Sequence, residues 1–573
     1  MKNIITNAAE ITVLRLIDNT FKTGGGPVSV GATCLVASKG LPFKVIQVVD
    51  SNWQNIFGKP LQKKADNMEG LRHLADAVKD CTYVNVVRVV PEDAKFPSVT
   101  IKTTDGVTAA AAHTYGTDLS LGTGICLQIY LVDGDESVNR SFKISHVNHG
   151  AWVTLTPYKI DDIITVIGGR LICTANHTSG ATAPSLAALG TDGWVQYNGV
   201  VGDNRFLLTF FDKDEEGTEY ELESYVVGVN VTDKDDMGAP AYIETVLEQK
   251  SDVFRCNFDE SLTYADVAAA LKAVSGTKVA FVGGTNGTFT DDAERVTQFK
   301  KAWDLFRNEQ YLSNLMFAAG NYDGDVIANC IDIANKNHNS FFYDINPTLT
   351  PDLAIAKVKE LGVESRQAAC YYSPYAASDA FYGGKTVWGV SGAVAAACAQ
   401  GDANFSGSTP GVHYAPAGIY RGKLARTGLK ALNSDLINRD DFYTYRINPV
   451  IASDTGGAVI DDCLSVHFKQ NYSRFIWVNR IANYIDHRFV EAAAYMKFEP
   501  DGLTRNGLTK LTKQILDELV VSGALVTPRD PADGTSPYLL KVEQVEIDLW
   551  LVTWDFCPTG AARRIAGQPR LIK

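Results

Sequence analysis

The chain has 573 residues, of which 45% are hydrophobic and 21% charged, and its formal net charge is -13. This composition is ordinary for a folded protein, and the length is sufficient for several domains. Phosphate binding requires clustered Lys and Arg, so the acidic balance argues against nucleic acid as a direct partner. The N-terminal sequence MKNIITNAAE lacks the apolar core of a secretory signal, and no apolar run approaches the ~20 residues that cross a bilayer. We therefore expect no membrane insertion.

The cysteines predict a reduced protein. Ten of them are scattered from Cys34 to Cys557, and no two form a C-x-x-C pair. This distribution offers no sequence-local zinc or redox site. Free, mostly buried thiols in a reducing compartment are the expectation.

The N-terminal region is interpreted as an arm followed by part of a core domain. Residues 1–27 contain a short segment, Ile11 to Ile17, with apolar residues on both faces, and they end in the glycine-rich joint Thr23 to Pro27. Residues 28–94 alternate strand and helix patterns, which is typical of an α/β core.

The pattern changes near residue 91. From 95 to 241, short alternating segments rich in Thr, Val, Gly and Asp predict an inserted all-β domain. Strands and helices alternate again over residues 242–540, beginning with an expected core strand at Val279–Val282. The predicted fold class is therefore α/β with several domains: a mixed core sheet covered by helices, an inserted all-β domain, and extended arms at both ends.

Two helices are predicted to close the second part of the core. Apolar residues recur at helical spacing in two runs, and the second run ends at Gly523. The side opposite its leucines carries Lys510, Lys513 and Asp517, for which a solvated surface is the ordinary interpretation. The two apolar runs are Ile481, Ile485, Phe489, Ala492 and Met496, and Leu508, Leu511, Ile515 and Leu519.

The C-terminal arm, residues 541–573, contains the most informative segment. Val545 to Phe556 alternates as one strand that becomes apolar on both faces from Leu549 onward, and the following tail has four basic residues and no acid. A central strand of the protein's own sheet is one interpretation. The other is that further copies of the chain cover the strand, which would make this a polymer-forming protein. The apolar residues concerned are Val545, Ile547, Leu549, Trp550, Leu551, Trp554 and Phe556.

No catalytic, cofactor-binding or metal-binding residue is predicted. Gly383 to Thr386 resembles the end of a phosphate-binding loop, but Asp379 stands where the first glycine belongs and would repel phosphate. Asp133 to Ile144 lacks the turn glycine and the final Glu of a calcium loop. His146 and His149 are not placed on a helix and have no adjacent Glu, so no metal site is assigned to them.

Seven short motifs follow one another in a recognisable order. They resemble, in that order, motifs of the tail sheath proteins of contractile-tailed bacteriophages and of related contractile injection particles. Val459 to Leu464 departs from the family, because a W-G-x-R-T-L signature would be expected there. The motifs are Gly31–Gly58, Phe281–Gly287, Tyr371–Tyr375, Ser391–Ala396, Ala415–Gly418, Ile447–Val450, and Val478–Asp486 with Lys497–Asp501.

The resemblance implies a structural subunit and no enzyme. Sheath proteins stack as hexameric rings in a helical lattice around a tail tube, meet baseplate and tail terminator proteins, and contract to drive the tube through the host envelope. They are assembled in the host cytoplasm and become part of the virion tail. Their terminal arms add as strands to sheets in neighbouring subunits.

The resemblance also implies roles for particular residues. Two segments occupy the positions of the sheath arms: the C-terminal segment Val545–Phe556, and an N-terminal segment with Ile11, Val13, Leu14 and Leu16. Lys510 and Lys513 occupy positions at which sheath proteins face the tube. A sheath of a bacteriocin or injection system fits equally well. An α/β enzyme with an appended β domain is the alternative from another class.

Overall fold

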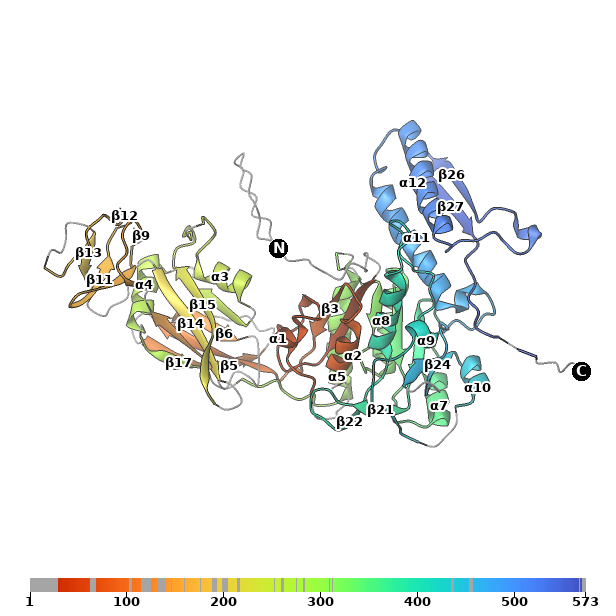
Figure 1. Ribbon diagram of the computed structural model, residues 1–573, viewed down its shortest axis with the longest axis horizontal. Coiled ribbons are helices and arrows are strands. Elements are labelled where there is room, and N and C mark those ends of the chain that lie inside the picture. Colours follow the sequence, from red (N-terminus) through yellow and green to blue (C-terminus); the bar gives the residue numbers. More distant parts are fainter. Residues whose placement is uncertain are drawn as a thin grey trace, which may run out of the picture.

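The computed structural model is elongated, with a β-rich part at one end, a central sheet covered by helices, and a helix pair with a hairpin at the other end (Figure 1). The predicted α/β fold with several domains is confirmed. The expected N-terminal arm, with Ile11, Val13, Leu14 and Leu16, lies outside the described residues. The structure describes residues 29–568, apart from 62–68, 103–105, 115–124, 132–139, 188–192, 198–204, 214–216, 259–261, 282–283, 434–436, 453–456, and positions 146, 159, 176, 236, 252, 275, 309, 312 and 566.

The central sheet has eight strands in the order β2-β3-β1-β18-β19-β20-β24-β25. The six inner strands are parallel, and β2 and β25 pair antiparallel at the two edges. The inner strands are short and apolar, as expected of strands buried on both faces. Their bounds are β1 Val30–Leu35, β2 Val45–Val48, β3 Tyr83–Arg88, β18 Leu315–Phe317, β19 Ser340–Asp344, β20 Ala368–Tyr372, β24 Ile447–Ala452 and β25 Ala458–Ile460.

Helices cover both faces of this sheet. Alternation along β18 sends Leu315 and Phe317 into one apolar cluster and Met316 into the other. The first cluster is closed by α1 (Trp53–Phe57), α2 (Gly70–Ala77) and α8 (Ser391–Asp402), and the second by α5 (Asp292–Asp304), α6 (Gly324–Lys336), α7 (Pro351–Leu361) and α10 (Arg439–Thr444).

Local sequence explains where the helices of the second layer begin. Asp291 and Asp323 each accept a backbone hydrogen bond at the start of α5 and α6, and Thr350 does the same for α7. Short elements complete the core: η3 Leu305–Arg307, β21 Tyr375–Ser378, β22 Lys385–Val387, α9 Gly418–Arg421, β23 Lys430–Ala431 and η4 Tyr472–Arg474; another, η5 Pro531–Asp533, belongs to the C-terminal end.

Helix α8 approaches α2 closely at Gly392. A Cβ on this glycine would lie 2.1 Å from the carbonyl oxygen of His73. Beside it, the carboxylate of Asp344 accepts hydrogen bonds from the backbone of Val390 at 2.7 Å and of Ser391 at 2.9 Å. The close approach explains why a small-residue motif begins this helix.

The β-rich part begins with β4 and contains two larger sheets, β16-β6-β4-β5 and β15-β14-β7-β17. The sequence predicts that this part ends at residue 241. In the structure it extends further, because β16 pairs with β6 and β17 pairs with β7. The expected core strand at Val279–Val282 is wrong, because Val279 pairs with Phe142 and packs in the β-rich cluster. The strands are β4 Lys95–Lys102, β5 Gly106–Thr114, β6 Ile125–Leu131, β7 Ser141–Ser145, β14 Arg205–Lys213, β15 Glu219–Gly228, β16 Phe254–Phe258 and β17 Lys278–Ala280, with helices α3 Ile243–Lys250 and α4 Tyr264–Ala273.

A smaller unit lies at the far end of the β-rich part (Figure 1). It has a four-stranded and a two-stranded sheet around a separate apolar cluster that includes Tyr158 and Trp194. Across the described residues, no helix combines the length and apolar character needed to cross a membrane. The strands of the small unit are β8 Asn148–Ala151, β9 Pro157–Tyr158, β10 Ile163–Val166, β11 Gly169–Cys173, β12 His177–Thr178 and β13 Trp194–Gln196.

The contact at Gly392 is testable with a pair of Gly→Ala variants. Because the added methyl group meets backbone, Gly392→Ala should destabilise the core by about 1–3 kcal/mol. Gly502→Ala is the matched control, since open space surrounds that helical glycine and the change should stabilise by no more than about 1 kcal/mol. Urea denaturation followed by tryptophan fluorescence measures both variants, and equal midpoints would contradict the prediction.

Candidate functional site

The C-terminal end of the molecule is built from two helices and a hairpin. Helix α11 (Ile476–Ala494) and helix α12 (Asp501–Val521) are followed by β26 (Tyr538–Glu546) and β27 (Leu549–Phe556). The predicted helical periodicity is confirmed, since the two helices bury their apolar stripes against each other. The buried residues include Ile481, Ile485, Leu508, Ile515 and Leu519.

The predicted single strand from Val545 to Phe556 is wrong in its first residues. The chain reverses at Ile547 and Asp548, so Val545 and Glu546 belong to the end of β26, and Leu549 begins β27. Apolar alternation continues through the turn, which hid the reversal in the sequence. Residues Leu549 to Phe556 do alternate as predicted, with every second side chain half-buried.

One face of the hairpin packs on the helices. Trp554 and Phe556 from β27, with Tyr538 and Leu540 from β26, lie against the apolar cluster of α11 and α12. The rings of Trp554 and Phe489 have centroids 4.8 Å apart. These contacts show that the hairpin is held by its own chain through this face.

A hydrogen bond reinforces the docking of the hairpin. The Tyr538 hydroxyl donates to the Asp517 carboxylate of α12 at 2.5 Å. Partial burial, together with this carboxylate, raises the pKa of Tyr538 to about 12. The phenol therefore stays protonated and remains a donor at any physiological pH.

The other face of the hairpin is uncovered within the described residues. The exposed fractions are 59% for Leu539, 55% for Val545, 47% for Leu549 and 48% for Leu551, and Ile547 at the turn is 90% exposed. The sheet consists of β26 and β27 alone, so among the described strands neither outer edge has a neighbour. Such edges and apolar residues are a ready template for another chain.

Polar side chains join α11 to the core, at the end of α8 and at the loop before β19. Arg480 donates from Nη2 to both carboxylate oxygens of Asp402 at 2.6 Å, and both residues are buried. Farther along the helix, Asp486 meets His338 at 2.7 Å. Since buried charges are costly unless well paired, these contacts fix the helix in one position on the core.

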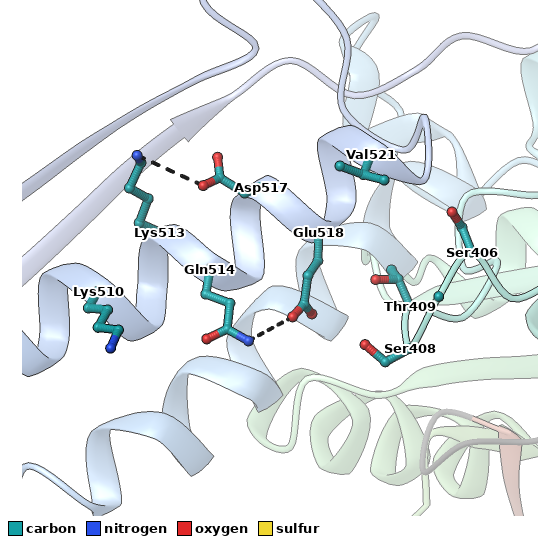
Figure 2. Close-up of a pocket in the computed structure, with 10 residues that line it drawn as sticks. Ser406, Ser408, Thr409, Lys510, Lys513, Gln514, Asp517, Glu518 and Val521 are labelled. Atoms are coloured by element: carbon teal, nitrogen blue, oxygen red, sulfur yellow. Dashed lines mark hydrogen bonds and ion pairs between the residues drawn. The ribbon is translucent and has the colours of Figure 1, made fainter.

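Lys510 and Lys513 lie on the exposed face of α12, along an open groove of about 500 Å³ that separates the helix from the loop Ser406–Thr409. Figure 2 shows Lys513 extending toward Asp517, which it meets at 3.9 Å, and away from the loop. Gln514 donates to Glu518 at 2.9 Å beside the loop. The face is therefore mixed in charge, and its cations are concentrated at Lys510 and Lys513.

The remaining candidate motifs have structural explanations or lie outside the described residues. Gly383 donates its backbone N–H to the carbonyl of Asp379 at 3.1 Å, so this run is a turn that leads into β22. His149 pairs with Asp162 at 3.0 Å, whereas His146 and residues 133–139 are outside the described residues. Among the residues described, no group of three metal-ligating side chains is found.

Sequence reasoning missed the partner of the basic tail. Arg563 makes a two-bonded ion pair with Asp462, which lies in the segment that departs from the sheath signature. A pair of adjacent carboxylates at Asp461 and Asp462 was the signal available in the sequence.

The inner face of the hairpin can be tested by truncating one side chain. Trp554→Ala should weaken docking by about 2 kcal/mol, roughly half the cost at a fully buried site, and so increase local opening up to about 30-fold. Trypsin cleavage at Lys541 measures the opening. The control is Leu551→Ala on the uncovered face, and similar cleavage rates for both variants would contradict the assignment of faces.

No family model matches the chain, and a search of curated proteins found no match. Solved structures do match. The sheath tail protein of Desulfitobacterium hafniense is 12% identical with a TM-score of 0.46, covering 96% of this chain and 100% of that one. The PVC sheath of an extracellular contractile injection system, in the contracted state, is 18% identical with a TM-score of 0.38 over 50% of this chain and 82% of that one. The contracted helical sheath of the anti-feeding prophage is 15% identical with a TM-score of 0.38 over 49% and 76%. All three of these structures are of sheath proteins.

Proposed function

We propose that the chain is the structural subunit of a contractile tail sheath. It polymerises as stacked hexameric rings around an inner tail tube, and contraction of the lattice drives the tube through the host envelope. The sheath-like motifs in family order support this function. The observation that carries it is the C-terminal hairpin, whose two edges are uncovered within the described residues, as are the leucines of its mixed polar and apolar outer face.

The hairpin is proposed as the acceptor of strands from neighbouring subunits. Because Val545 to Phe556 belong to a hairpin of their own chain, they receive a strand rather than supply one. The proposed donor is the N-terminal segment Ile11 to Ile17 of another subunit. A ladder of ~6 backbone hydrogen bonds contributes only ~3–9 kcal/mol, at ~0.5–1.5 kcal/mol each.

Burial of the outer face is the proposed source of energy for contraction. Leu539, Leu549 and Leu551 are about half exposed, so each has apolar surface still to bury. If the contracted lattice buries ~100 Å² more apolar surface per subunit, the gain is ~2.5 kcal/mol at ~25 cal/mol/Å². Summed over the subunits of a tail, this term drives shortening without a nucleotide.

The proposed partners are further copies of the chain, the tube protein, and the baseplate and tail terminator proteins. The proposed location is the virion tail, after assembly in the host cytoplasm. A sheath of a bacteriocin or injection system would have the same structure and the same motifs, and the neighbouring genes distinguish these origins. Electron microscopy distinguishes both from an α/β enzyme, since an enzyme does not form wide striated tubes.

The donor role of the N-terminal arm can be tested by truncation. Removal of residues 1–22 takes away the segment Ile11 to Ile17 and leaves every described residue in place. The truncated chain should fold with unchanged circular dichroism and fail to form tubes by electron microscopy and sedimentation. Removal of residues 1–8 is the control and should leave tube formation intact. Tubes formed by the longer truncation would count against strand exchange.

The proposed contact between α12 and the tube can be tested by charge reversal. The double variant Lys510→Glu/Lys513→Glu should reduce co-assembly with purified tube, because it replaces two cations that would meet acidic groups. Lys300→Glu/Lys336→Glu on α5 and α6 changes net charge equally on another exposed surface and is the control. If both double variants co-assemble as well as the original chain, α12 does not face the tube.

A further inference from the structure

The small unit of the β-rich part forms one end of the molecule (Figure 1). Its root is fixed to the larger sheet, because Arg205 at the start of β14 donates to the Asp162 carboxylate at 2.8 Å, and the Arg205 backbone N–H donates to Asp161 at 3.2 Å. Strand β10 begins directly after these two acids and runs away from the root to a tight turn at Ile167 and Gly168. The turn therefore lies at the end of the unit that is farthest from its root.

A second loop reaches the same end of the unit. Strand β8 pairs in parallel with β10, and Ala151, the last residue of β8, is the partner of Thr165. The loop that follows β8 therefore emerges beside the turn that follows β10. We call this loop and this turn, residues 152–156 and 166–168, the distal tip.

The distal tip exposes apolar side chains. The exposed fractions are 100% for Ile167, 78% for Leu155 and 55% for Val153. Neither residues 150–158 nor residues 163–169 contain a charged side chain. Exposed apolar residues that gather at one point, with no charge among them, are typical of an interaction site.

Leu155 is held in a backbone conformation that its side chain does not favour. Its φ is 54°, in the left-handed region that asparagine and glycine adopt more readily. Hydrogen bonds fix the loop in this shape: the Leu155 backbone N–H donates to the Ser179 carbonyl at 3.1 Å, the Ser179 hydroxyl donates to the Val153 carbonyl at 2.7 Å, and the Thr154 hydroxyl donates to the Gly180 carbonyl at 2.7 Å. Since the exposed leucine gains no burial that offsets the strain, its presence points to a role outside the folded unit.

A basic side chain lies beside the distal tip. Arg170 is exposed, follows Gly168 by two positions on β11, and makes no ion pair with any described residue. Its partner across the hairpin is Thr165 on β10. A cation next to an uncharged apolar cluster matches the layered chemistry of a lipid surface, in which anionic headgroups cover an apolar interior.

We propose that the distal tip binds the surface of a lipid bilayer that contains anionic lipids. The side chains of Ile167, Leu155 and Val153 enter the boundary of the acyl chains, and Arg170 meets the phosphate groups. Such a contact lies on the bilayer and needs no segment that crosses it. It goes beyond the proposed sheath function and does not depend on it.

Charge favours lipid over a second copy of the chain as the occupant. A symmetric contact between two distal tips would bring the two Arg170 cations together, because the same surface is used on both sides. A lipid surface instead offers phosphate to the cation and apolar chains to Ile167 and Leu155. It therefore satisfies both parts of the tip at once.

Vesicle flotation with the full chain tests the proposal. The original chain should float with vesicles of phosphatidylcholine and phosphatidylglycerol in equal parts. The double variant L155N/I167S should bind at least about tenfold more weakly, because two apolar side chains no longer enter the lipid. Arg170→Gln should bind these vesicles about fivefold more weakly, and it should bind vesicles of phosphatidylcholine alone like the original chain.

The substitutions are chosen to keep the small unit folded. Asparagine is favoured at the left-handed φ of Leu155, and Gly168, with a φ of 88°, retains the turn when Ile167 becomes serine. The thermal unfolding midpoint of L155N/I167S should therefore be no lower than that of the original chain. Met237→Ser is the matched control, since Met237 is 95% exposed elsewhere in the β-rich part, and it should leave flotation unchanged.

Fluorescence quenching measures entry into the lipid separately. Trp152 borders the distal tip and packs partly on the apolar cluster of the small unit. Lipids brominated in their acyl chains should quench the tryptophan emission of the original chain, and they should quench that of Trp152→Phe less. Equal flotation of the original chain and L155N/I167S, or no quenching of the original chain, would overturn the proposal. Self-association that is lost in L155N/I167S without any vesicles would also overturn it, because the tip would then bind another copy.

Discussion

The C-terminal sheet has only two strands, and only one of its faces is packed within the described residues. Its stability therefore depends on the elements that cover that face. The β26–β27 hairpin obtains one layer of cover from α11 and α12, through Trp554 and its neighbours. A hairpin of two strands is marginally stable by itself, so packing on the helix pair is what stabilises it. The edges and the outer face remain available for other chains because the first face is secured within the subunit.

The contact between the helix pair and the core determines where the hairpin lies relative to the central sheet. Buried polar groups form much of this contact, with Arg480 and Asp402 as the charged pair and Asn483 and Gln367 exchanging two amide hydrogen bonds. Removing one member of a buried pair costs about 3–5 kcal/mol, since the remaining charge has no partner. An apolar contact would permit sliding, whereas these directional bonds allow one arrangement of α11 on the sheet.

The sequence predicted those parts of the molecule whose pattern is local. The periods of α11 and α12 were sufficient to place their buried faces, and the alternation of Leu549 to Phe556 was sufficient to predict a strand but not which of its faces is covered by its own chain. The reversal at Ile547 and Asp548 was missed because an apolar residue at the turn continues the alternation of the strand. A single Asp is a weak turn signal without an adjacent glycine.

Other features depend on residues that are distant in sequence, and no local pattern contains them. The strand at Lys278–Ala280 has a pattern that fits either sheet, and only its pairing with β7 places it in the β-rich part. The partners Asp462 and Arg563 are separated by 101 positions. Sequence alone indicated a basic tail and a pair of carboxylates, but their meeting follows from the path of the whole C-terminal end.

Each contact that this chain could make with another copy is weak, so assembly would require several contacts at once. A partly exposed ion pair contributes about 0.2–1 kcal/mol, and even a complete strand ladder remains within a few kcal/mol. A subunit joined to its neighbours at several such points gains from the high effective concentration that each contact gives to the next. The proposed lattice can therefore be stable while each contact remains breakable, as is required if subunits are to change position without dissociating. The negative net charge opposes assembly, since acidic copies of the chain repel one another.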